Sequence, residues 1–290
     1  MRELLIYFYA ESPVHAGASN AEADIDLPIQ REKHSRYPVI YGQSLKGALR
    51  NAAEARFTDD ELTRCFGSAP NPGGSTTPGL VSVGDAQLVA MPVPTLRRTF
   101  AWVTSTVALG RLARKYRALG LRFDLPVPKD PDKAHAPAEH WMGEQVLGPI
   151  SMQVKESGST SVSEWADRIG MDALPNEEPF AHIGKKLNED LILVPSDAMS
   201  VLVEESTEVS VRVQLDKYKT VAAGPFHSEY LPTESLLAAT VTLHEDLGLR
   251  DAANVKELLG GSSTELHQIG GDESIGKGLM WTHVVDGGDE

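Results

Sequence analysis

The chain has 290 residues, of which 27 are basic and 41 acidic, so its formal net charge is −14 and its pI is near 5.1. This balance excludes a surface evenly coated in positive charge for nucleic acid or an anionic membrane, although a local basic groove stays compatible with it. The apolar content of 41% is typical of a folded globular protein and excludes bulk disorder.

Cysteine content and hydropathy limit the setting of the protein. Cys65 is the single cysteine, so the sequence offers neither an intrachain disulfide nor a cysteine-based zinc site, and we expect no structural zinc. No apolar run approaches the ~20 residues that a membrane-spanning helix needs, so we expect no membrane partner. A reduced, cytoplasmic compartment is the simplest interpretation.

The first half of the chain alternates predicted strands and helices. The apolar run at 4–10 is short and rich in aromatic residues, which predicts a buried strand rather than a signal peptide. Residues 11–40 form a long polar loop, and loops of this length are usually functional. Apolar spacing of i, i+3, i+4 and i+7 after Ser44 predicts a helix with Ser44 as its N-cap. A strand over 80–90 and a helix over 99–120 are predicted next.

The second half begins with the segment that is hardest to interpret. Residues 124–190 contain several prolines and predict an irregular insertion rather than a separate domain. Alternating apolar and polar residues over 208–221 predict a β-hairpin, within an inserted segment at 205–230. A strand, a helix and two further strands are then expected, at residues 235–244, 251–259, 265–269 and 279–285. We therefore predict an α+β protein with the split βαβ pattern of a ferredoxin-like fold, residues 1–290 forming one domain.

Charge is segregated along the chain. The stretch from Arg97 to Arg122 contains Arg97, Arg98, Arg111, Arg114, Lys115, Arg117 and Arg122 and no acidic residue, whereas acidic residues dominate after Glu229. A solvated helix face and a patch that follows a phosphate backbone both explain such a stretch. Lys46 in the first turn of the predicted helix would add to the backbone N–H groups there, which favour a phosphate.

A glycine-rich turn lies near the C-terminus. Gly271–Gly278 fits the pattern G-x-x-x-x-G-K, but Gly278 stands where a nucleotide-binding P-loop needs a serine or threonine. The residues that follow predict a strand, whereas a P-loop opens a helix. Two interpretations stay open: a tight turn between strands, or a glycine loop packed on an RNA backbone with Lys277 as a point charge.

Three segments together resemble the RAMP superfamily of CRISPR proteins. They are the helix start Tyr41-Gly-Gln-Ser-Leu-Lys-Gly-Ala-Leu-Arg50, the glycine turn at 269–278, and the opening strand followed by His15-Ala-Gly17. Within the superfamily, Asp26-Leu-Pro-Ile-Gln-Arg-Glu-Lys-His34 is similar to the backbone-nuclease family of the type III-B (Cmr) effector complexes. Phe100-Ala-Trp-Val-Thr104 and Glu229-Tyr-Leu-Pro232 are also similar to that family.

The resemblance implies an RRM-like palm that carries a β-hairpin thumb. It also implies that copies stack head to tail along a crRNA, together with other Cmr subunits, and that each copy cuts the paired target RNA once. The family's catalytic aspartate matches Asp26, and His15, Glu229 and Tyr230 match residues proposed to surround it. The residues expected to contact RNA are Ser44, Lys46, Arg50, Arg97, Arg98, Gly270, Gly271, Gly276, Lys277 and Gly278.

Cleavage of RNA by its own 2′-OH needs a base near that hydroxyl, in-line geometry and charge relief at the phosphate. Asp26 suits either the base or a ligand to a divalent ion, Mg²⁺ or Mn²⁺, and the sequence does not separate the two roles. The products implied by the resemblance are a 2′,3′-cyclic phosphate and a 5′-OH. Two other functions compete: a non-cutting RNA scaffold, and a standalone endoribonuclease that processes CRISPR repeats.

The predicted hairpin also has two interpretations. As a thumb, its tip would wedge into the guide–target duplex, displace a base pair and expose the flanking backbone to in-line attack. Alternatively, it is an edge hairpin that closes the sheet.

Overall fold

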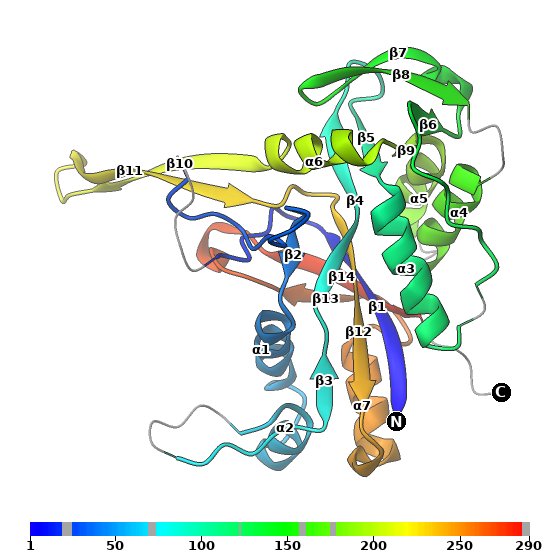
Figure 1. The fold of residues 1–290 in the computed structure, drawn as a ribbon. Coiled ribbons are helices and arrows are strands. Elements are labelled where there is room, and N and C mark those ends of the chain that lie inside the picture. The colour runs from blue at the N-terminus through cyan, green and yellow to red at the C-terminus, as the bar shows by residue number, and fades with distance from the viewer. Residues whose placement is uncertain (19–24, 69–73, 122, 157–160, 175–177, 286–290) are drawn as a thin grey trace.

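The computed structural model describes residues 1–290 except 19–24, 69–73, 122, 157–160, 175–177 and 286–290 (Figure 1). The strands are β1 (Arg2–Ala10), β2 (Val39–Ile40), β3 (Val81–Val83), β4 (Ala86–Pro94), β5 (Phe100–Thr104), β6 (Ala134–Ala136), β7 (Gly143–Leu147), β8 (Ile150–Glu156), β9 (Leu191–Leu193), β10 (Glu208–Leu215), β11 (Val221–Tyr230), β12 (Leu236–Leu243), β13 (Glu265–Gln268) and β14 (Leu279–Val285). The α-helices are α1 (Gly42–Ala53), α2 (Asp59–Phe66), α3 (Thr106–Ala118), α4 (Ser161–Ala173), α5 (Glu178–Asp190), α6 (Ser196–Glu205) and α7 (Leu249–Leu258). Short 3-10 helices are η1 (Glu139–Trp141), η2 (Glu245–Leu247) and η3 (Glu273–Ile275).

The palm is an antiparallel sheet in which β1 lies between β12 and β14. β12 continues to β3 and β4 on one side, and β14 pairs with β13 on the other. α1 lies between β1 and β3 in the chain, and α7 lies between β12 and β13. The two strand–helix–strand units interleave their strands, which confirms the predicted split βαβ arrangement and the α+β class (Figure 1).

Strand β1 is buried on both faces, which explains its continuous apolar sequence. Leu4, Ile6 and Phe8 pack in the core that contains the apolar faces of α1 and α7. Leu5 and Tyr7 point to the opposite core, which contains α3 and α4. Alternation along a strand sends successive side chains to opposite faces, so a strand covered on both sides needs apolar residues at every position.

The predicted helix over 99–120 is wrong in its first part. Residues 100–104 form strand β5, which pairs antiparallel with β4 and parallel with β9. Helix α3 starts only after Ser105, whose side chain accepts a hydrogen bond from the N–H of Ala108 at 3.2 Å. Phe100 and Val103 fit a helical spacing, but the aromatic and β-branched residues of this stretch also favour a strand, and sheet pairing decides between them.

Irregular structure over 124–190 is also a wrong prediction. Beyond the proline-rich start, this segment forms β6, β7, β8, α4 and α5 and extends the sheet past β9 (Figure 1). Trp165 and Ile169 of α4 are fully buried in the core under α3. The prolines interrupt regular structure only at the start of the segment, and helical spacing of apolar residues follows later in it. Residues 157–160 and 175–177 lie outside the described residues.

The predicted hairpin is confirmed. Its second strand extends to Tyr230, beyond the end at residue 221 that the sequence predicted. β10 and β11 pair in a sheet of their own and project from the palm after α6 (Figure 1). Val209, Val211 and Val213 are 46–59% exposed, so their alternation does not mark a buried face. We call this hairpin the thumb; it does not join the large sheet as an edge closure.

Within the described ranges, no helix is long and apolar enough to cross a membrane.

A buried carboxylate joins α5 to η1 and to the turn before β5. Asp190 is fully buried, and its carboxylate lies 2.6 Å from Nζ of Lys186 and 3.0 Å from Nε1 of Trp141. His140 and Arg98 approach the same carboxylate at 3.0 and 3.2 Å. One buried charge therefore holds groups from α5, η1 and the turn before β5.

We expect Asp190→Ala to lower the free energy of unfolding by about 3–5 kcal/mol, because it leaves the part-buried Lys186 ammonium without its counter-charge and the Trp141 indole N–H without its acceptor. Glu189→Ala is the matched control, since Glu189 pairs only at the surface with Arg98 (side chains 34% and 39% exposed). Surface pairs contribute about 0–1 kcal/mol. Denaturant unfolding of both variants measures the difference, and equal losses would contradict this assignment.

Candidate active site at the root of the thumb

Three segments that are far apart in the sequence meet where the thumb joins the palm. The loop after β1 contacts the end of β11 through a bridge between Val14 and Leu231. The same loop contacts the glycine turn before β14 through a bridge between His15 and Gly271. Further along, Leu27 pairs in parallel with Ser228 of β11. The predicted catalytic residues therefore share one region, although residues 19–24 of this loop lie outside the description.

Asp26 lies on the accessible side of this region. Its Oδ2 accepts a hydrogen bond from the backbone N–H of His227 at 2.7 Å, and the His227 ring Nδ1 lies 3.4 Å from the same oxygen. The Asp26 side chain is 51% exposed. The backbone hydrogen bond lowers the pKa of Asp26 below its usual value, so the carboxylate is ionised at neutral pH. This leaves a fixed, charged carboxylate open to a ligand.

His15 is held against the end of β11, at Glu229 and Tyr230, and not against Asp26. Its Nδ1 lies 2.8 Å from the backbone oxygen of Glu229, and its ring is tilted against that of Tyr230, with 5.6 Å between centroids. Because a carbonyl oxygen only accepts, Nδ1 is the donor in this contact. The arrangement fixes the position of the His15 ring.

Glu229 is buried beneath the loop. Its carboxylate accepts hydrogen bonds from the backbone N–H of Ile29 at 3.0 Å and from Oγ1 of Thr207 at 2.8 Å. Arg31 completes the set with a buried ion pair. Glu229 therefore faces protein groups, in contrast to Asp26.

Tyr230 is also buried, with its hydroxyl donating to Asp272 of the glycine turn at 2.7 Å. Burial and this hydrogen bond raise the pKa of Tyr230, so the phenol stays neutral. Arg212 of β10 holds the same carboxylate with both terminal nitrogens, at 2.9 and 3.0 Å. Nζ of Lys277 lies 4.8 Å from the centre of the Tyr230 ring. The thumb and the glycine turn are thus joined through Asp272.

The glycine turn depends on glycine where it passes His15. Gly270 has φ +88°, and a Cβ there would lie 2.4 Å from the backbone oxygen of His15. The N–H of Gly271 donates to that oxygen at 2.9 Å. Gly276 and Gly278 also have positive φ, and strand β14 follows at once. The strand confirms that this is not a P-loop, while the exposed Gly271 and Gly276 leave its backbone accessible.

The start of α1 differs from the prediction. The helix begins at Gly42 with Tyr41 as N-cap, so Ser44 is not the capping residue. The N–H of Gly42 donates to Oδ1 of Asp85 at 2.7 Å. This carboxylate already occupies part of the helix N-terminus where a phosphate was expected. The physical reason is that β3 and β4 pack against the helix start and bring Asp85 with them.

Three further predicted RNA contacts on α1 have partners within the protein. Ser44 Oγ accepts from Nε2 of Gln30 at 3.2 Å, and Arg50 pairs with Glu54 at 3.0 Å. Lys46 donates to the backbone oxygen of Val81 at 2.8 Å, and burial lowers the pKa of its ammonium.

The basic stretch is partly structural. Arg98 pairs with two acidic residues of α5, and Arg97 donates to the backbone oxygen of His140 at 3.1 Å. Lys115 donates to Oε1 of Gln87 at 2.8 Å. Arg114 and Arg117 of α3 are exposed, and Arg122 lies outside the described residues. The stretch is therefore a mixture of internal ion pairs and solvated charge.

His227 is the residue that sequence reasoning missed. It lies on β11, 38% exposed, with both its backbone N–H and its ring against Asp26. The two residues are 201 positions apart, and no local pattern links them. The available signal was its place two residues before Glu229, within the inserted segment at 205–230.

Asp26 is the residue that the sequence predicts as a possible ligand to a divalent ion. Its Oδ2 is engaged by His227, while the exposed carboxylate keeps lone pairs for a cation. Among the residues that the structure describes, no group of three or more histidine, cysteine or acidic side chains gathers around a common point. Mg²⁺ is often held by one or two carboxylates together with phosphate oxygens and water, so a single carboxylate fits that mode.

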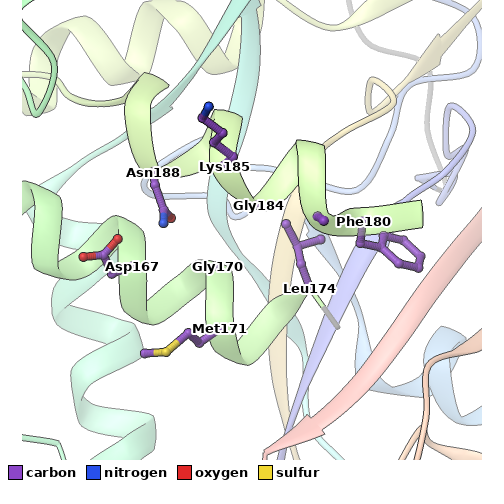
Figure 2. A pocket seen from close by; sticks show the side chains of 9 residues that line it. Asp167, Gly170, Met171, Leu174, Phe180, Gly184, Lys185 and Asn188 are labelled. Carbon is purple, nitrogen blue, oxygen red and sulfur yellow. The ribbon is translucent and has the colours of Figure 1, made fainter. Parts of the chain in front are cut away.

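A separate pocket lies between α4 and α5 (Figure 2). It is lined by apolar side chains such as Met171, Leu174 and Phe180, with Asp167 and Lys185 at its rim. None of its lining residues belongs to the region around Asp26. The residues predicted to be catalytic therefore lie at the root of the thumb and do not line this pocket.

A model of the RAMP superfamily matches residues 7–281 of the chain. The CRISPR system Cmr endoribonuclease Cmr4 of Pyrococcus furiosus is 30% identical over 285 residues, which are 97% of this chain and 95% of that protein. The crystal structure of oligomeric Cmr4 from Pyrococcus furiosus matches with a TM-score of 0.77 at 27% identity, over 99% of this chain and 100% of that one. A chain of the type III-B Cmr-beta complex bound to cognate target RNA shares the fold, with a TM-score of 0.75 at 19% identity, over 98% of this chain and 97% of that one. The chain therefore belongs to the RAMP superfamily and, within it, to the Cmr4 family.

Proposed function

We propose that the chain is the repeated backbone subunit of a type III-B CRISPR effector, which binds crRNA and cleaves the paired target RNA once per copy. The observation that supports this proposal most directly is the exposed Asp26 carboxylate, which His227 holds at the root of the thumb. The similarity of the chain to an endoribonuclease supports it as well. Further copies of the chain and other Cmr subunits are its partners, and the cytoplasm is its compartment. A relative solved as an oligomer supports the repeated assembly.

The proposed reaction is attack of a ribose 2′-OH on the adjacent phosphorus. The 2′-OH loses its proton, the O2′–P bond forms, and the P–O5′ bond breaks as the 5′-oxygen takes up a proton, leaving a 2′,3′-cyclic phosphate and a 5′-OH. The ionised Asp26 carboxylate is the base or orients the hydroxyl. The thumb bends the duplex so that the 2′-oxygen, phosphorus and 5′-oxygen come into line.

A divalent ion, Mg²⁺ or Mn²⁺, belongs to the same proposal. Asp26 would be its protein ligand among the described residues, with phosphate oxygens and water completing the shell. Bound there, the ion would relieve negative charge at the phosphate. The protein's own part is to hold the Asp26 carboxylate through the N–H of His227.

The glycine turn is the proposed contact with the guide backbone. Gly271 and Gly276 are exposed and carry no side chain, so an RNA backbone can approach closely. Lys277 adds a positive charge next to the turn. Arg212 neutralises the Asp272 carboxylate, which would otherwise repel phosphates at this place.

We expect Asp26→Ala to slow target cleavage about 10²–10⁴-fold in the assembled effector, the usual cost of losing a catalytic acid–base group. Target RNA binding should persist, because Asp26 carries no positive charge for the backbone. Asp60→Ala, which removes an exposed carboxylate on α2, is the control. Single-turnover cleavage and filter binding test both, and wild-type cleavage by Asp26→Ala would favour a non-cutting role for this residue.

We expect His227→Ala to slow cleavage, but by less than the ~10²–10⁴-fold expected for Asp26→Ala. The backbone N–H that holds Asp26 Oδ2 remains in this variant, and only the ring contact is lost. Val211→Ala, opposite His227 on β10, is the control for thumb stability. A His227→Ala variant that cleaves at the wild-type rate would show that the His227 ring has no role in cleavage.

We expect Lys277→Ala to weaken guide RNA binding and to reduce the slope of log affinity against log salt by about one, the signature of one lost phosphate contact. Lys129→Ala, at an exposed position away from the site, should leave the slope unchanged. Titrations at several salt concentrations provide the measurement. An unchanged slope in Lys277→Ala would argue against a phosphate at this lysine.

A further inference from the structure

A buried ion pair connects the Asp26 loop to the thumb. Nη2 of Arg31 lies 2.5 Å from Oε1 of Glu229, and the two side chains are only 4% and 3% exposed. Burying a charge is costly unless its partners satisfy it, so such a pair must be complete in the folded protein. Glu229 is satisfied by three donors, which come from Arg31, Ile29 and Thr207.

The other donors of Arg31 reach the element that leads into the thumb. Its Nη1 donates at 2.9 Å to the backbone oxygen of Val203, in α6, and at 2.9 Å to that of Arg36 in the same loop. Thr207, which also donates to Glu229, lies between α6 and β10. One guanidinium therefore joins the loop to the segments before and within the thumb.

The backbone around Asp26 follows the thumb as well. Leu27 donates to the backbone oxygen of His227 at 3.0 Å, and its own oxygen accepts from the N–H of Glu229 at 2.9 Å. These are the bonds of a parallel strand pair. Asp26 precedes Leu27 directly and bonds the N–H of His227. The Asp26 segment is thus attached to β11 by a single parallel bridge at Leu27 and by the Asp26–His227 hydrogen bond, next to the buried Glu229–Arg31 pair.

We propose that Arg31 is the positioning residue for the Asp26 carboxylate, and that the Arg31–Glu229 pair makes the Asp26 segment move with the thumb as one unit. The inference rests on the proposed function, because it assigns a positioning residue to that same catalytic site. When the thumb is displaced by the RNA duplex, the carboxylate is carried with it. Cleavage is thereby coupled to correct seating of the thumb.

The three hydrogen-bond acceptors around the Arg31 side chain require an arginine at this position. A guanidinium offers five donors in a rigid fork and here serves one carboxylate and two carbonyl oxygens in different directions. A lysine ammonium keeps the charge but cannot span the same three acceptors. We therefore expect Arg31→Lys to fold and to recover only part of the cleavage rate.

The test compares Arg31→Met with the wild type in the assembled effector with guide and target RNA. We expect single-turnover cleavage to fall about 10²-fold, since a displacement near 1 Å has this effect on a positioned group. Target affinity should change less than about twofold. Arg36→Met is the matched control: Arg36 belongs to the same loop and also reaches α6 through Glu204, but that pair is 37–45% exposed. Its cleavage rate should equal that of the wild type.

Two results would overturn the proposal. One is a folded Arg31→Met variant that cleaves at the wild-type rate; the other is a parallel loss of cleavage and target affinity, which would give the pair only a scaffolding role. If Arg31→Met does not fold, Thr207→Val decides, because it removes one donor from Glu229 without burying a lone charge. Slower cleavage with intact affinity in Thr207→Val supports the proposal, and wild-type cleavage overturns it.

Asp26→Ala in the same assay keeps the two hypotheses apart. Full cleavage by Asp26→Ala contradicts the proposed catalytic function itself. Loss of cleavage in Asp26→Ala together with wild-type cleavage in Arg31→Met overturns only the positioning role.

Discussion

The antiparallel pairing of β1 with both β12 and β14 determines where the candidate site forms. Because both neighbours run opposite to β1, the end of β1 lies beside the beginnings of β12 and β14, with Ala10 opposite Met280 and Tyr9 opposite Leu236. The loop after β1, the residues before β12 and the glycine turn before β14 must then meet at one end of the sheet. His15, Glu229, Tyr230 and the glycine turn are neighbours for this reason.

Burial separates the roles of the residues gathered there. Asp26 is half exposed, whereas Glu229 and Tyr230 are buried and satisfied by protein donors and acceptors. Moving a buried carboxylate breaks its hydrogen bonds to three donors and costs free energy. An exposed carboxylate can contact a substrate without breaking a bond within the protein. The same distinction applies to the basic residues. Arg98 forms an ion pair with the buried Asp190, whereas Arg114 on α3 is exposed to solvent. Residue type alone does not reveal this difference.

The sequence predicted the topology well because hydrophobic periodicity and glycine turns report directly on sheets and their connections. It failed at 100–104, where one apolar run fits both a strand and a helix and only pairing with β4 and β9 decides. It failed over 124–190 because prolines at the start masked regular elements further on. The site residues came from a family resemblance, while His227 was missed because its contact with Asp26 spans 201 positions. Ser44 was assigned as a cap because its side-chain type suggested it, but the helix begins two residues earlier, at Gly42, whose N–H donates to Asp85 from a distant part of the sequence.

The thumb and the Asp26 loop stabilise each other. A two-stranded hairpin is marginally stable by itself, and this one exposes Val209, Val211 and Val213. Its root is instead fixed by the bridge at Leu27, by the buried Glu229 and by Arg212 against the glycine turn. The loop in turn buries Val14, Ile29 and Tyr37 in the core and is bound to β11 through Leu27 and Asp26. A change that loosens one is therefore expected to loosen the other, because the Asp26 carboxylate and the root of the thumb share the same hydrogen bonds.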